Sequence, residues 1–573
     1  MNAVKIYLVY LLVFFAGFAH AQEPDIDDPA TALSGHPIQK KIICSNGAVV
    51  SAHPLASKAG VAVLKKGGNA VDAAIATQLA LAVVYPGAGN IGGGGFMVAR
   101  LKDGRNIAMD YREKAPAAAQ RDMYLDSAGN PLMNLSQYGH LASGVPGTVA
   151  GIFASLKYAK LPLKTLIAPA IALAENGFAI TQNEANGLNG SRASFVKYNS
   201  VQPVFVKETA WKAGDILVQK DLAATLKRIR DFGQKGFYEG ETARLIVEEM
   251  QRGKGLLTYE DLKSYQAKER TVLSFPYRGY TVITMPLPSS GGIIINQAMR
   301  MIEDKNIGRM GFQSVAAVHL MVEAERRAYA DRAEFMGDVD FVKVPVKKLT
   351  SNAYIKERFS DFDAAKAGSS AVTKAGNINP ESEETTHLSI IDKYGNAVSI
   401  TTTLNGGYGS KTVVGGAGFL LNNEMDDFSV KPGVPNMYGA LGTEANAIAP
   451  GKRMLSSMTP AIVLKNNKPF IVLGTPGGTT IPTSVYQTLV NMLDFNMSTA
   501  DAVYKPKFHH QWLPDEVYVE KGFDAAVIDQ LKAMGYKVSV RGQIGRTEVI
   551  KVLPNKKFEA IADNRGDDGA EGY

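Results

Sequence analysis

The sequence contains very little cysteine. Cys44 is the single cysteine among 573 residues, which excludes an intramolecular disulfide and any metal cluster built from cysteines. A lone cysteine can be a reactive thiol, but we interpret Cys44 as a small buried residue. With 46% hydrophobic and 20% charged residues, the chain has the composition of an ordinary globular protein that buries a large core.

Long apolar segments are also lacking after the N-terminus. Lys5, the apolar residues 6–18 and the sequence Ala19-His20-Ala21 follow one another in the order of a signal peptide. The apolar run is shorter than the roughly 20 residues that a membrane-spanning helix needs. The sequence therefore predicts cleavage after Ala21, export to the periplasm or the exterior, and no stable membrane insertion.

A block of basic residues is absent as well, although the formal net charge is +7. Lysine and arginine are spread along the chain, without a basic stripe that alternates with aromatic residues. We interpret this charge as that of a solvated surface and predict no nucleic-acid partner.

Two glycine-containing segments resemble phosphate-binding loops but lack the required context. Residues 87–92 match the pattern G-x-G-x-x-G, yet a predicted helix precedes them and a predicted strand follows, the reverse of a dinucleotide site. Residues 409–412 lack the Gly-Lys-Ser/Thr order of a P-loop. We predict no nucleotide cofactor and expect the first glycine run to let two backbones approach closely near a pocket.

His509 and His510 raise the question of a metal site. Adjacent histidines on a strand or loop point in opposite directions and do not bind one ion together. We therefore predict structural roles for both histidines, with neither a metal nor another cofactor.

Capping residues and periodicity predict several helices and strands. Pro54 begins a predicted helix that ends at Gly67, and a second helix covers residues 70–84. Two strands, 461–465 and 469–473, are expected to form a hairpin. A further helix over residues 315–330 has a polar side made of Glu323, Glu325, Arg326 and Arg327.

Thr385 and Thr386 stand directly before an alternating segment that predicts a strand. Strands often begin with β-branched residues, so the pair has an ordinary structural explanation. The alternative is that the chain is cut before Thr385, which makes this residue an N-terminal nucleophile with its own α-amine as base. Residues 365–384 are rich in Ala, Gly, Ser, Asn and Glu and predict an exposed linker leading to Thr385, as expected if the chain is opened there.

Ten short segments, in this order along nearly the whole mature chain, resemble the gamma-glutamyltranspeptidase family, and together they are far more specific than any single motif. The segments are residues 53–57, 68–74, 92–96, 111–113, 288–292, 384–387, 421–428, 455–458, 474–478 and 508–512.

The resemblance implies an α+β fold, a four-layer αββα sandwich of the N-terminal-nucleophile hydrolase type. Family members are made as one chain that cleaves itself, here between Glu384 and Thr385. The signal peptide would be residues 1–21, the large subunit 22–384 and the small subunit 385–573, with both subunits in one globule. The new α-amine would titrate at a pKa of about 7.7 to 8.0, close enough to neutral to act as a general base.

The resemblance also implies roles for individual residues. Thr385 would be the nucleophile, Thr403 would orient its hydroxyl, and the N–H groups of Gly477 and Gly478 would form the oxyanion hole. Arg112 would bind the substrate α-carboxylate, with a cation on one side of the site and carboxylates on the other. The serines assisting Arg112 would be Ser456 and Ser457, and the residues around the α-ammonium would be Asn405, Glu424 and Asp427.

The expected reaction is cleavage of gamma-glutamyl amides such as glutathione, with transfer of the acyl group to water, an amino acid or a dipeptide. A lid over residues 432–446 is expected to place Tyr438 over the pocket. Two alternatives remain: an acylase of the same fold with another acyl substrate, as in the related cephalosporin acylases, and a binding protein without activity. Arg112 with Ser456 and Ser457 argues against the acylase, because these residues match an amino-acid head group. The presence of all four expected catalytic residues argues against an inactive binding protein; they are Thr385, Thr403, Gly477 and Gly478.

Overall fold

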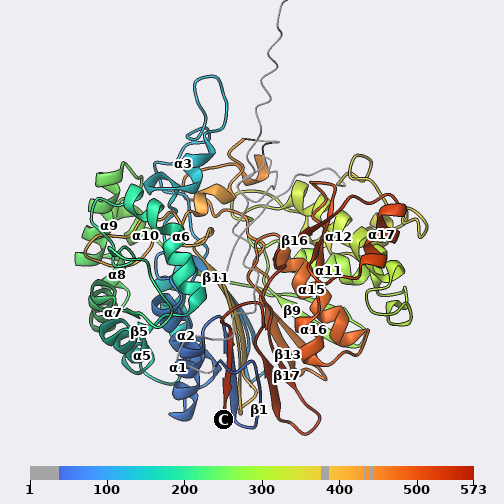
Figure 1. Ribbon diagram of the computed structural model, residues 1–573, viewed down its shortest axis with the longest axis horizontal. Coiled ribbons are helices and arrows are strands. Elements are labelled where there is room, and N and C mark those ends of the chain that lie inside the picture. The colour runs from blue at the N-terminus through green and yellow to red at the C-terminus, as the bar shows by residue number, and fades with distance from the viewer. Residues whose placement is uncertain (1–37, 376–385, 432–433, 435–436, 438–443) are drawn as a thin grey trace, which may run out of the picture.

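The structure is a computed structural model that describes residues 38–375, 386–431, 434, 437 and 444–573. The predicted signal peptide and the predicted site residues Glu384, Thr385 and Tyr438 lie outside the described residues. Two β-sheets stand face to face at the centre, and helices cover the outer face of each sheet (Figure 1). The predicted α+β class and the four-layer αββα sandwich are confirmed.

The first sheet has seven strands in the order β19-β2-β10-β11-β3-β4-β7. All six pairs of neighbouring strands are antiparallel. Every residue of β10 is buried, because this strand has strands on both sides and covering layers on both faces. The strands are β2 (Gly47–Ser51), β3 (Gly94–Arg100), β4 (Asn106–Asp110), β7 (Lys268–Arg270), β10 (Thr386–Asp392), β11 (Ala397–Thr403) and β19 (Gly569–Gly572).

The second sheet also has seven strands, in the order β1-β18-β17-β13-β12-β9-β8. Its predicted hairpin is confirmed: β12 and β13 are joined by Asn466 and Asn467, whose φ angles of 50° and 61° are those of a tight type I′ turn. The strands are β1 (Lys41–Cys44), β8 (Leu273–Tyr277), β9 (Tyr280–Thr284), β12 (Ala461–Lys465), β13 (Lys468–Gly474), β17 (Glu548–Val552) and β18 (Phe558–Ile561).

Each sheet combines strands from before residue 376 with strands from after residue 385. In the first sheet β10 lies between β2 and β11, and in the second sheet β18 pairs with β1 while β12 pairs with β9. The inner faces share one apolar cluster, with Val50 and Phe96 from the first sheet and Ile462 and Val472 from the second. The two parts of the chain therefore have a common core.

Helices α1 (Pro54–Lys65), α2 (Ala70–Val84) and α5 (Leu163–Asn176) lie on the outer side of the first sheet (Figure 1). Asn69 caps α2 by accepting hydrogen bonds from the N–H groups of Val71 and Asp72, and the Asp72 carboxylate accepts from the Asn69 N–H in return. All of α2 is buried between the sheet and its neighbours. The two helices predicted near the N-terminus are thus confirmed.

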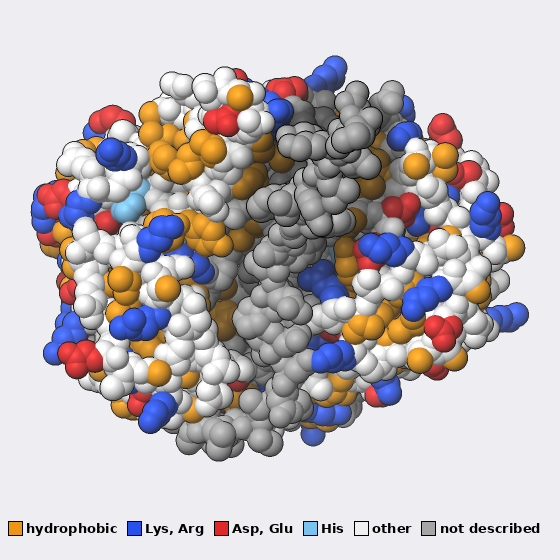
Figure 2. Space-filling view, turned by 45° about the horizontal axis from the view of Figure 1, so that its top comes forward, with side chains coloured by type: hydrophobic (Ala, Val, Ile, Leu, Met, Phe, Trp, Pro, Cys, Tyr) orange, Lys and Arg blue, Asp and Glu red, His pale blue; other side chains and the backbone are white. Residues whose placement is uncertain are grey.

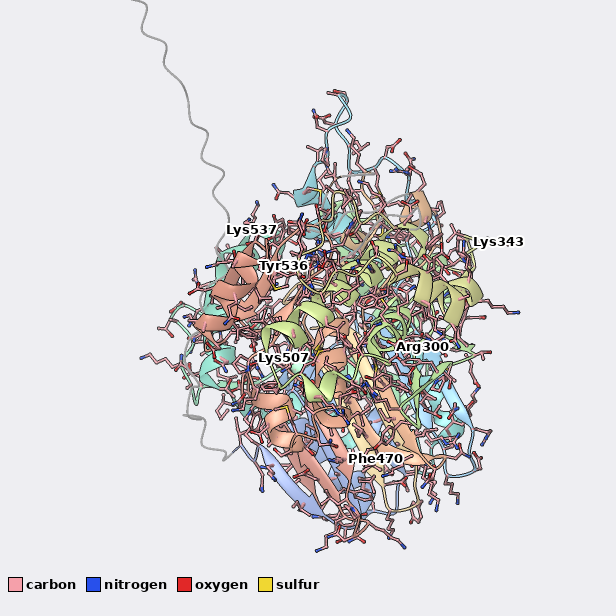
Figure 3. All side chains as sticks on the ribbon, turned by 90° about the vertical axis from the view of Figure 1, so that its right-hand side faces the viewer. Arg300, Lys343, Phe470, Lys507, Tyr536 and Lys537 are labelled. Atoms are coloured by element: carbon pink, nitrogen blue, oxygen red, sulfur yellow. The ribbon has the colours of Figure 1, made fainter. Side chains whose placement is uncertain are left out.

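Helices α11 (Gly291–Ile302), α12 (Val315–Phe335) and α15 (Thr480–Leu493) cover the second sheet. The predicted polar side of α12 does not face solvent: Glu323, Glu325, Arg326 and Arg327 are at most 2% exposed. Glu323 pairs with Arg326 at 3.1 Å and Arg327 at 2.6 Å, and accepts a hydrogen bond from Tyr536. Tyr536 itself is labelled in Figure 3.

These contacts explain how a carboxylate is tolerated inside the protein. Burial alone raises the pKa of Glu323, but the guanidinium groups of Arg326 and Arg327 outweigh that effect and hold the pKa at about 2. Helical periodicity finds such a polar side, but it does not show whether water or another charged layer lies against it.

The prediction of an exposed linker over residues 365–384 is confirmed only in part where the structure describes it: Ala365, Lys366, Ala371, Val372 and Lys374 are exposed, but other residues of the segment are not. Ser370, Thr373 and Ala375 are buried. The Ser370 N–H donates to the Asp515 carboxylate at 2.7 Å, and the Trp512 indole N–H donates to the Thr373 carbonyl at 2.8 Å. Small polar residues therefore dock this segment onto the region around Trp512, and residues 376–384 lie outside the described residues.

The C-terminal residues are part of the first sheet. After β19, the carbonyl of Tyr573 accepts hydrogen bonds from the N–H groups of Ser45 and Asn46 at 3.2 and 2.7 Å. Cys44 lies beside them, buried as predicted, and its thiol donates to the Gly47 carbonyl at 3.2 Å. Burial raises the pKa of this thiol, which disfavours the reactive thiolate.

The remaining elements surround this sandwich. Within the described ranges, no helix has both the length and the apolar character needed to cross a membrane. On the face shown in Figure 2, basic and acidic side chains are interspersed. The other elements are α3 (Met133–Gln137), α4 (Thr148–Ser155), α6 (Gln182–Tyr198), α7 (Lys220–Phe232), α8 (Lys235–Tyr238), α9 (Gly240–Gly253), α10 (Tyr259–Ser264), α13 (Val346–Leu349), α14 (Asn352–Arg358), α16 (Thr499–Tyr504), α17 (Ala525–Ala533), β5 (Phe178–Ala179), β6 (Ile216–Leu217), β14 (Phe508–His509), β15 (Val517–Glu520) and β16 (Val538–Arg541).

Close contact between the two sheets generates a prediction at Gly474. A Cβ atom added at this position would lie 2.2 Å from Cε1 of His387, whose ring hydrogen-bonds Thr401 and Ser389 and cannot easily move. We expect Gly474→Ala to destabilise the protein by about 1–3 kcal/mol, the usual cost of overpacking a core. Gly190→Ala is the matched control, because a Cβ atom there meets nothing within 4 Å in helix α6. Thermal unfolding should show a lower Tm for the first variant only; an unchanged Tm would show that the sheets separate to accommodate the methyl group.

Candidate active site

Arg112 lies two residues after β4, and its side chain is fully buried. The guanidinium donates to the carbonyls of Met454 at 3.2 Å and Leu455 at 3.1 Å. It also contacts the carboxylates of Glu424 and Asp427. Arg112 is therefore held in a fixed orientation between backbone oxygens and carboxylates.

Glu424 and Asp427 begin and end one short 3₁₀ helix, residues Glu424–Asp427. The side chain of Asn422 holds the start of this helix, because its oxygen accepts hydrogen bonds from the Glu424 N–H at 3.1 Å and the Gly144 N–H at 2.8 Å. Asn446 donates to the Asp427 carbonyl at 2.6 Å and holds the other end. The two asparagines position both carboxylates against Arg112.

The structure changes one expectation about the charges. We expected a cation on one side of the site and carboxylates on the other, but Arg112 directly contacts Glu424 and Asp427, and Glu113 lies 3.5 Å away. A buried guanidinium costs several kcal/mol unless carboxylates pair with it. The result is one cluster, here called the head-group cluster, with one guanidinium among three carboxyl groups: Arg112, Glu113, Glu424 and Asp427.

Ser456 and Ser457 follow the two carbonyls that bind Arg112. The Ser456 carbonyl accepts hydrogen bonds from the N–H and hydroxyl of Ser290, at 2.7 and 2.8 Å. Arg332 on α12 donates to the Ser457 hydroxyl at 2.6 Å and to the Ser290 hydroxyl at 2.9 Å. The serine pair is therefore anchored to helix α12 through a second buried arginine.

Gly477 and Gly478 connect β13 to α15. Their φ angles of 133° and 61° lie in the region that favours glycine, and a Cβ atom on Gly477 would meet the Thr480 hydroxyl at 2.5 Å. Their carbonyls accept the first hydrogen bonds of α15, from Thr480 and Ile481. Within the described part of the chain, neither glycine N–H donates a hydrogen bond. Two N–H groups at a helix N-terminus can stabilise a developing negative charge.

Thr403 ends strand β11, close to the first residue of β10. Thr386 pairs with Thr402 across the two strands, and the Thr403 hydroxyl accepts a hydrogen bond from the Asn405 N–H at 2.7 Å. The Asn405 side chain donates to the Asn423 carbonyl at 3.0 Å. Thr403 and Asn405 thus connect the start of β10 with the segment that carries the head-group cluster.

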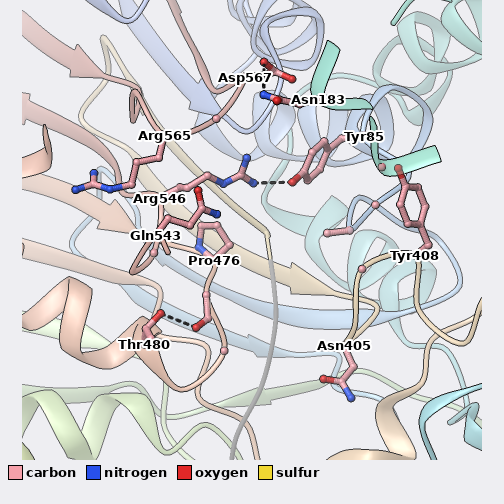
Figure 4. Close-up of a pocket in the computed structure, with 18 of the residues that line it drawn as sticks. Tyr85, Asn183, Asn405, Tyr408, Pro476, Thr480, Gln543, Arg546, Arg565 and Asp567 are labelled. Carbon is pink, nitrogen blue, oxygen red and sulfur yellow. Dashed lines mark hydrogen bonds between the residues drawn. The ribbon is translucent and has the colours of Figure 1, made fainter. Parts of the chain in front are cut away.

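A cavity of about 610 Å³ lies beside the Gly477-Gly478 loop (Figure 4). Asn405, Gly477 and Gly478 line it, whereas the head-group cluster does not. Further lining comes from the C-terminal part of the chain and from α6. In Figure 4 the Arg546 side chain points toward Tyr85, whereas that of Arg565 points the other way.

The structure brings nine of the predicted site residues into two neighbouring groups. One group surrounds Arg112 and the other follows β11 and β13. The remaining predicted residues, Glu384, Thr385 and Tyr438, lie outside the described residues. The nine are Arg112, Thr403, Asn405, Glu424, Asp427, Ser456, Ser457, Gly477 and Gly478.

Sequence reasoning missed the residues that support these groups. Asn90 donates to the Thr403 carbonyl at 2.8 Å and accepts from the Thr148 hydroxyl at 2.7 Å. The glycine run that contains Asn90 was expected to allow close backbone approach, and this is confirmed: a Cβ atom on Gly93 would lie 2.0 Å from the Thr403 carbonyl oxygen. That run was the available signal for Asn90, whereas nothing local distinguishes Arg332 from the other arginines of α12.

His509 and His510 both hydrogen-bond protein side chains. His509 bonds Thr483 at 2.9 Å and Gln511 at 2.8 Å, and His510 lies 3.3 Å from Asp515. Burial lowers the pKa of His509 to about 3 and that of His510 to about 4, so both rings are neutral near pH 7. Among the described residues, no group of three or more His, Cys, Asp and Glu side chains has the arrangement of a metal site.

Comparison with solved structures supports this architecture. The crystal structure of cephalosporin acylase from Bacillus halodurans has a TM-score of 0.82 at 27% identity and covers 96% of this chain and 99% of that one. The gamma-glutamyltranspeptidase of Helicobacter pylori has a TM-score of 0.57 at 47% identity and covers 59% of this chain and 97% of that one. The predicted N-terminal-nucleophile type of sandwich is confirmed.

Comparison with known sequences gives the family. A glutathione hydrolase proenzyme of Escherichia coli (strain K12) is 48% identical over 543 residues, which are 94% of this chain and 93% of that protein. The family model described as gamma-glutamyltranspeptidase matches residues 56–573. The predicted class of enzyme, a gamma-glutamyltransferase made as a proenzyme, is confirmed as well. The chain belongs to the gamma-glutamyltranspeptidase family.

Proposed function

We propose that the chain cleaves itself between Glu384 and Thr385 and then transfers gamma-glutamyl groups. In the first reaction the Thr385 hydroxyl attacks the Glu384 carbonyl, and the peptide C–N bond gives way to an ester. Water hydrolyses the ester, which leaves a carboxylate on Glu384 and a free α-amine beside the Thr385 hydroxyl. This amine is the general base of the second reaction.

The interleaved sheets support a mature enzyme of two subunits, residues 22–384 and 385–573. Strands from both sides of the cut are hydrogen-bonded neighbours in both sheets, and one apolar cluster holds residues from both parts. Cutting one peptide bond removes none of these contacts. Residues 1–21 direct export to the periplasm or the exterior and are removed.

In the second reaction Thr385 attacks the γ-carbonyl carbon of glutathione or a related gamma-glutamyl amide. The hydroxyl proton passes to the α-amine, and the carbonyl oxygen takes up negative charge facing the N–H groups of Gly477 and Gly478. When the C–N bond breaks, the leaving amine receives the proton. Attack by water or by an acceptor amine then releases the acyl group and returns a proton to the Thr385 oxygen. Thr403 orients the hydroxyl throughout.

The observation that carries this proposal is the head-group cluster. A gamma-glutamyl group ends in an α-carboxylate and an α-ammonium, and Arg112 with the nearby Ser456 and Ser457 provides donors for the first. Arg112 contacts the carboxylates of Glu424 and Asp427, and carboxylates at this position are suited to bind the α-ammonium. Asn405 completes this side, and Tyr438 of the lid covers the pocket.

The same cluster separates this function from that of an acylase with the same fold. A glutaryl group has the same length as a gamma-glutamyl group but lacks the α-ammonium, so it would lose the charge-assisted contact with the carboxylates of Glu424 and Asp427. Sites built to bind a polar group strongly reject analogues that lack it. The acylase alternative therefore predicts that glutaryl substrates are cleaved at least as efficiently as gamma-glutamyl substrates.

This difference can be measured directly. We expect the purified enzyme to release p-nitroaniline from gamma-glutamyl-p-nitroanilide at least about 100-fold more efficiently than from glutaryl-p-nitroanilide, measured as kcat/KM. Equal efficiency, or a preference for the glutaryl compound, would establish the acylase alternative.

Thr385→Ala should remain one uncut chain without activity, because the variant has no hydroxyl to attack either carbonyl. Thr386→Val is the matched control: its hydroxyl has no hydrogen-bond partner among the described residues, so this variant should still be cut. A denaturing gel and the anilide assay on the same samples give both readouts. Wild-type protein that is fully active as a single full-length band would contradict self-cleavage.

Arg112→Lys should mainly raise KM for gamma-glutamyl-p-nitroanilide. Lysine keeps the positive charge that the buried carboxylates need but loses the forked contact with the substrate carboxylate. A lost charge-assisted hydrogen bond is worth about 1.5–3 kcal/mol, which predicts an increase in KM of about 10- to 100-fold. The gel shows whether the variant is still cut, and an unchanged KM in cut protein would remove Arg112 from the substrate site.

A further inference from the structure

The cavity beside Gly477 and Gly478 is separate from the head-group cluster in its lining. Both glycines line it, together with Asn405, but none of the cluster residues does. A substrate whose γ-carbonyl faces the two N–H groups has its head group at Arg112. The part beyond the scissile bond must then extend away from Arg112, and this cavity, which both glycines line, has ample volume for a dipeptide.

Most charged side chains that line the cavity already have partners. Arg565 pairs with Glu520 at 2.6 Å and Asp563 at 3.0 Å. Arg546 donates to the Tyr85 hydroxyl at 2.7 Å and lies 3.6 Å from the Asp568 carboxylate. These two guanidinium groups are therefore neutralised locally.

The two acidic lining residues, Glu184 and Asp567, have different surroundings. Asp567 accepts hydrogen bonds from the Thr181 hydroxyl at 2.6 Å and from Asn183 at 3.1 Å. Burial raises the pKa of Glu184 to about 8, so this carboxyl group is mostly protonated at neutral pH. Neither acid forms an ion pair with a lining arginine in the described structure.

Arg541, the last residue of β16, is the exception. Its side chain is half-buried, lines the cavity and lies over the Tyr518 ring, 5.5 Å from the ring centre. Within the described residues its guanidinium makes no ion pair and no hydrogen bond. A positioned guanidinium without a carboxylate partner, at the wall of a cavity, is suited to bind a carboxylate from a ligand.

We propose that this cavity is the subsite for the leaving group and the acceptor, and that Arg541 binds their terminal carboxylate. The proposal rests on the proposed function, because it needs a gamma-glutamyl ester on Thr385. It selects acceptors that are free amino acids or short peptides with an unblocked C-terminus over amines that lack a carboxylate. Arg541 is thus a specificity-determining residue for the transfer step.

In the transfer step, the contact between Arg541 and the acceptor carboxylate positions the acceptor amine. The uncharged acceptor amine attacks the ester carbonyl carbon, a C–N bond forms, and the C–O bond to Thr385 breaks. The amine loses one proton, and the Thr385 oxygen gains one through the α-amine. Binding of the acceptor carboxylate to Arg541 holds the amine near the ester without taking part in these bond changes.

The test compares glycylglycine with glycylglycinamide, which differ in the terminal carboxylate. Gamma-glutamyl-p-nitroanilide is the donor, and acceptor kcat/KM is calculated for the concentration of unprotonated amine. We expect wild-type enzyme to prefer glycylglycine by about 10-fold or more, the value of one charge-assisted contact. Arg541→Gln should reduce this ratio to near one, mainly through a higher KM for glycylglycine.

Arg244→Gln is the matched control. Arg244 is exposed on α9, pairs with Glu241 and Glu248, and does not line the cavity, so its loss should leave the acceptor ratio unchanged. A wild-type ratio near one, or a ratio that persists in Arg541→Gln, overturns the proposed subsite, while anilide release without acceptor still supports the proposed function. No anilide release by wild-type enzyme overturns both.

Discussion

Strand β10 is hydrogen-bonded to strands from both parts of the chain, one before position 385 and one after it. It pairs with β2 from the first part of the chain and with β11 from the second, and in the second sheet β1 and β9 from the first part pair with β18 and β12 from the second. This arrangement allows a bond next to a buried strand to be cut without separating the products, because hydrogen bonds and a common apolar cluster connect them across the cut. It also explains how one candidate site can combine Arg112 from before the proposed cut with Glu424, Ser456 and Gly477 from after it.

Buried charge is the second constraint on the site. Arg112 and Arg332 are both fully buried, and each connects the first part of the chain to a loop of the second. Buried ion pairs contribute little net stability, because desolvation offsets most of their attraction. Removing one partner is nevertheless costly, because it leaves a buried charge unpaired. These arginines therefore fix the relative position of two segments more than they strengthen the fold, as the proposed site for a small zwitterionic group requires.

Local sequence signals correctly predicted the helices and the hairpin that begin or turn at residues with strong backbone preferences. Pro54 and Asn69 begin helices, and Asn466-Asn467 turns a hairpin, because these residues favour those backbone conformations wherever they occur. The polar side of α12 was identified, but its burial was not, since charged layers packed against it come from distant segments. Similarly, residues 365–375 have the composition of a linker, yet contacts with Trp512 and Asp515 dock them.

The candidate site was predicted by family resemblance, since no local pattern brings Arg112, Glu424 and Gly477 together. The resemblance did not include the direct contact between Arg112 and both carboxylates, nor supporting residues such as Asn90 and Arg332. Each of these follows from packing between segments that are far apart in the chain, and such packing leaves no periodic signal.

The position of the last strands has a consequence for the timing of maturation. Strand β18 enters the second sheet between β1 and β17, and β19 closes the edge of the first sheet beside β2. Neither sheet is complete until residues 558–572 have left the ribosome and folded onto strands made hundreds of residues earlier. Neither sheet, and hence neither scaffold of the candidate site, can therefore be completed before the end of translation.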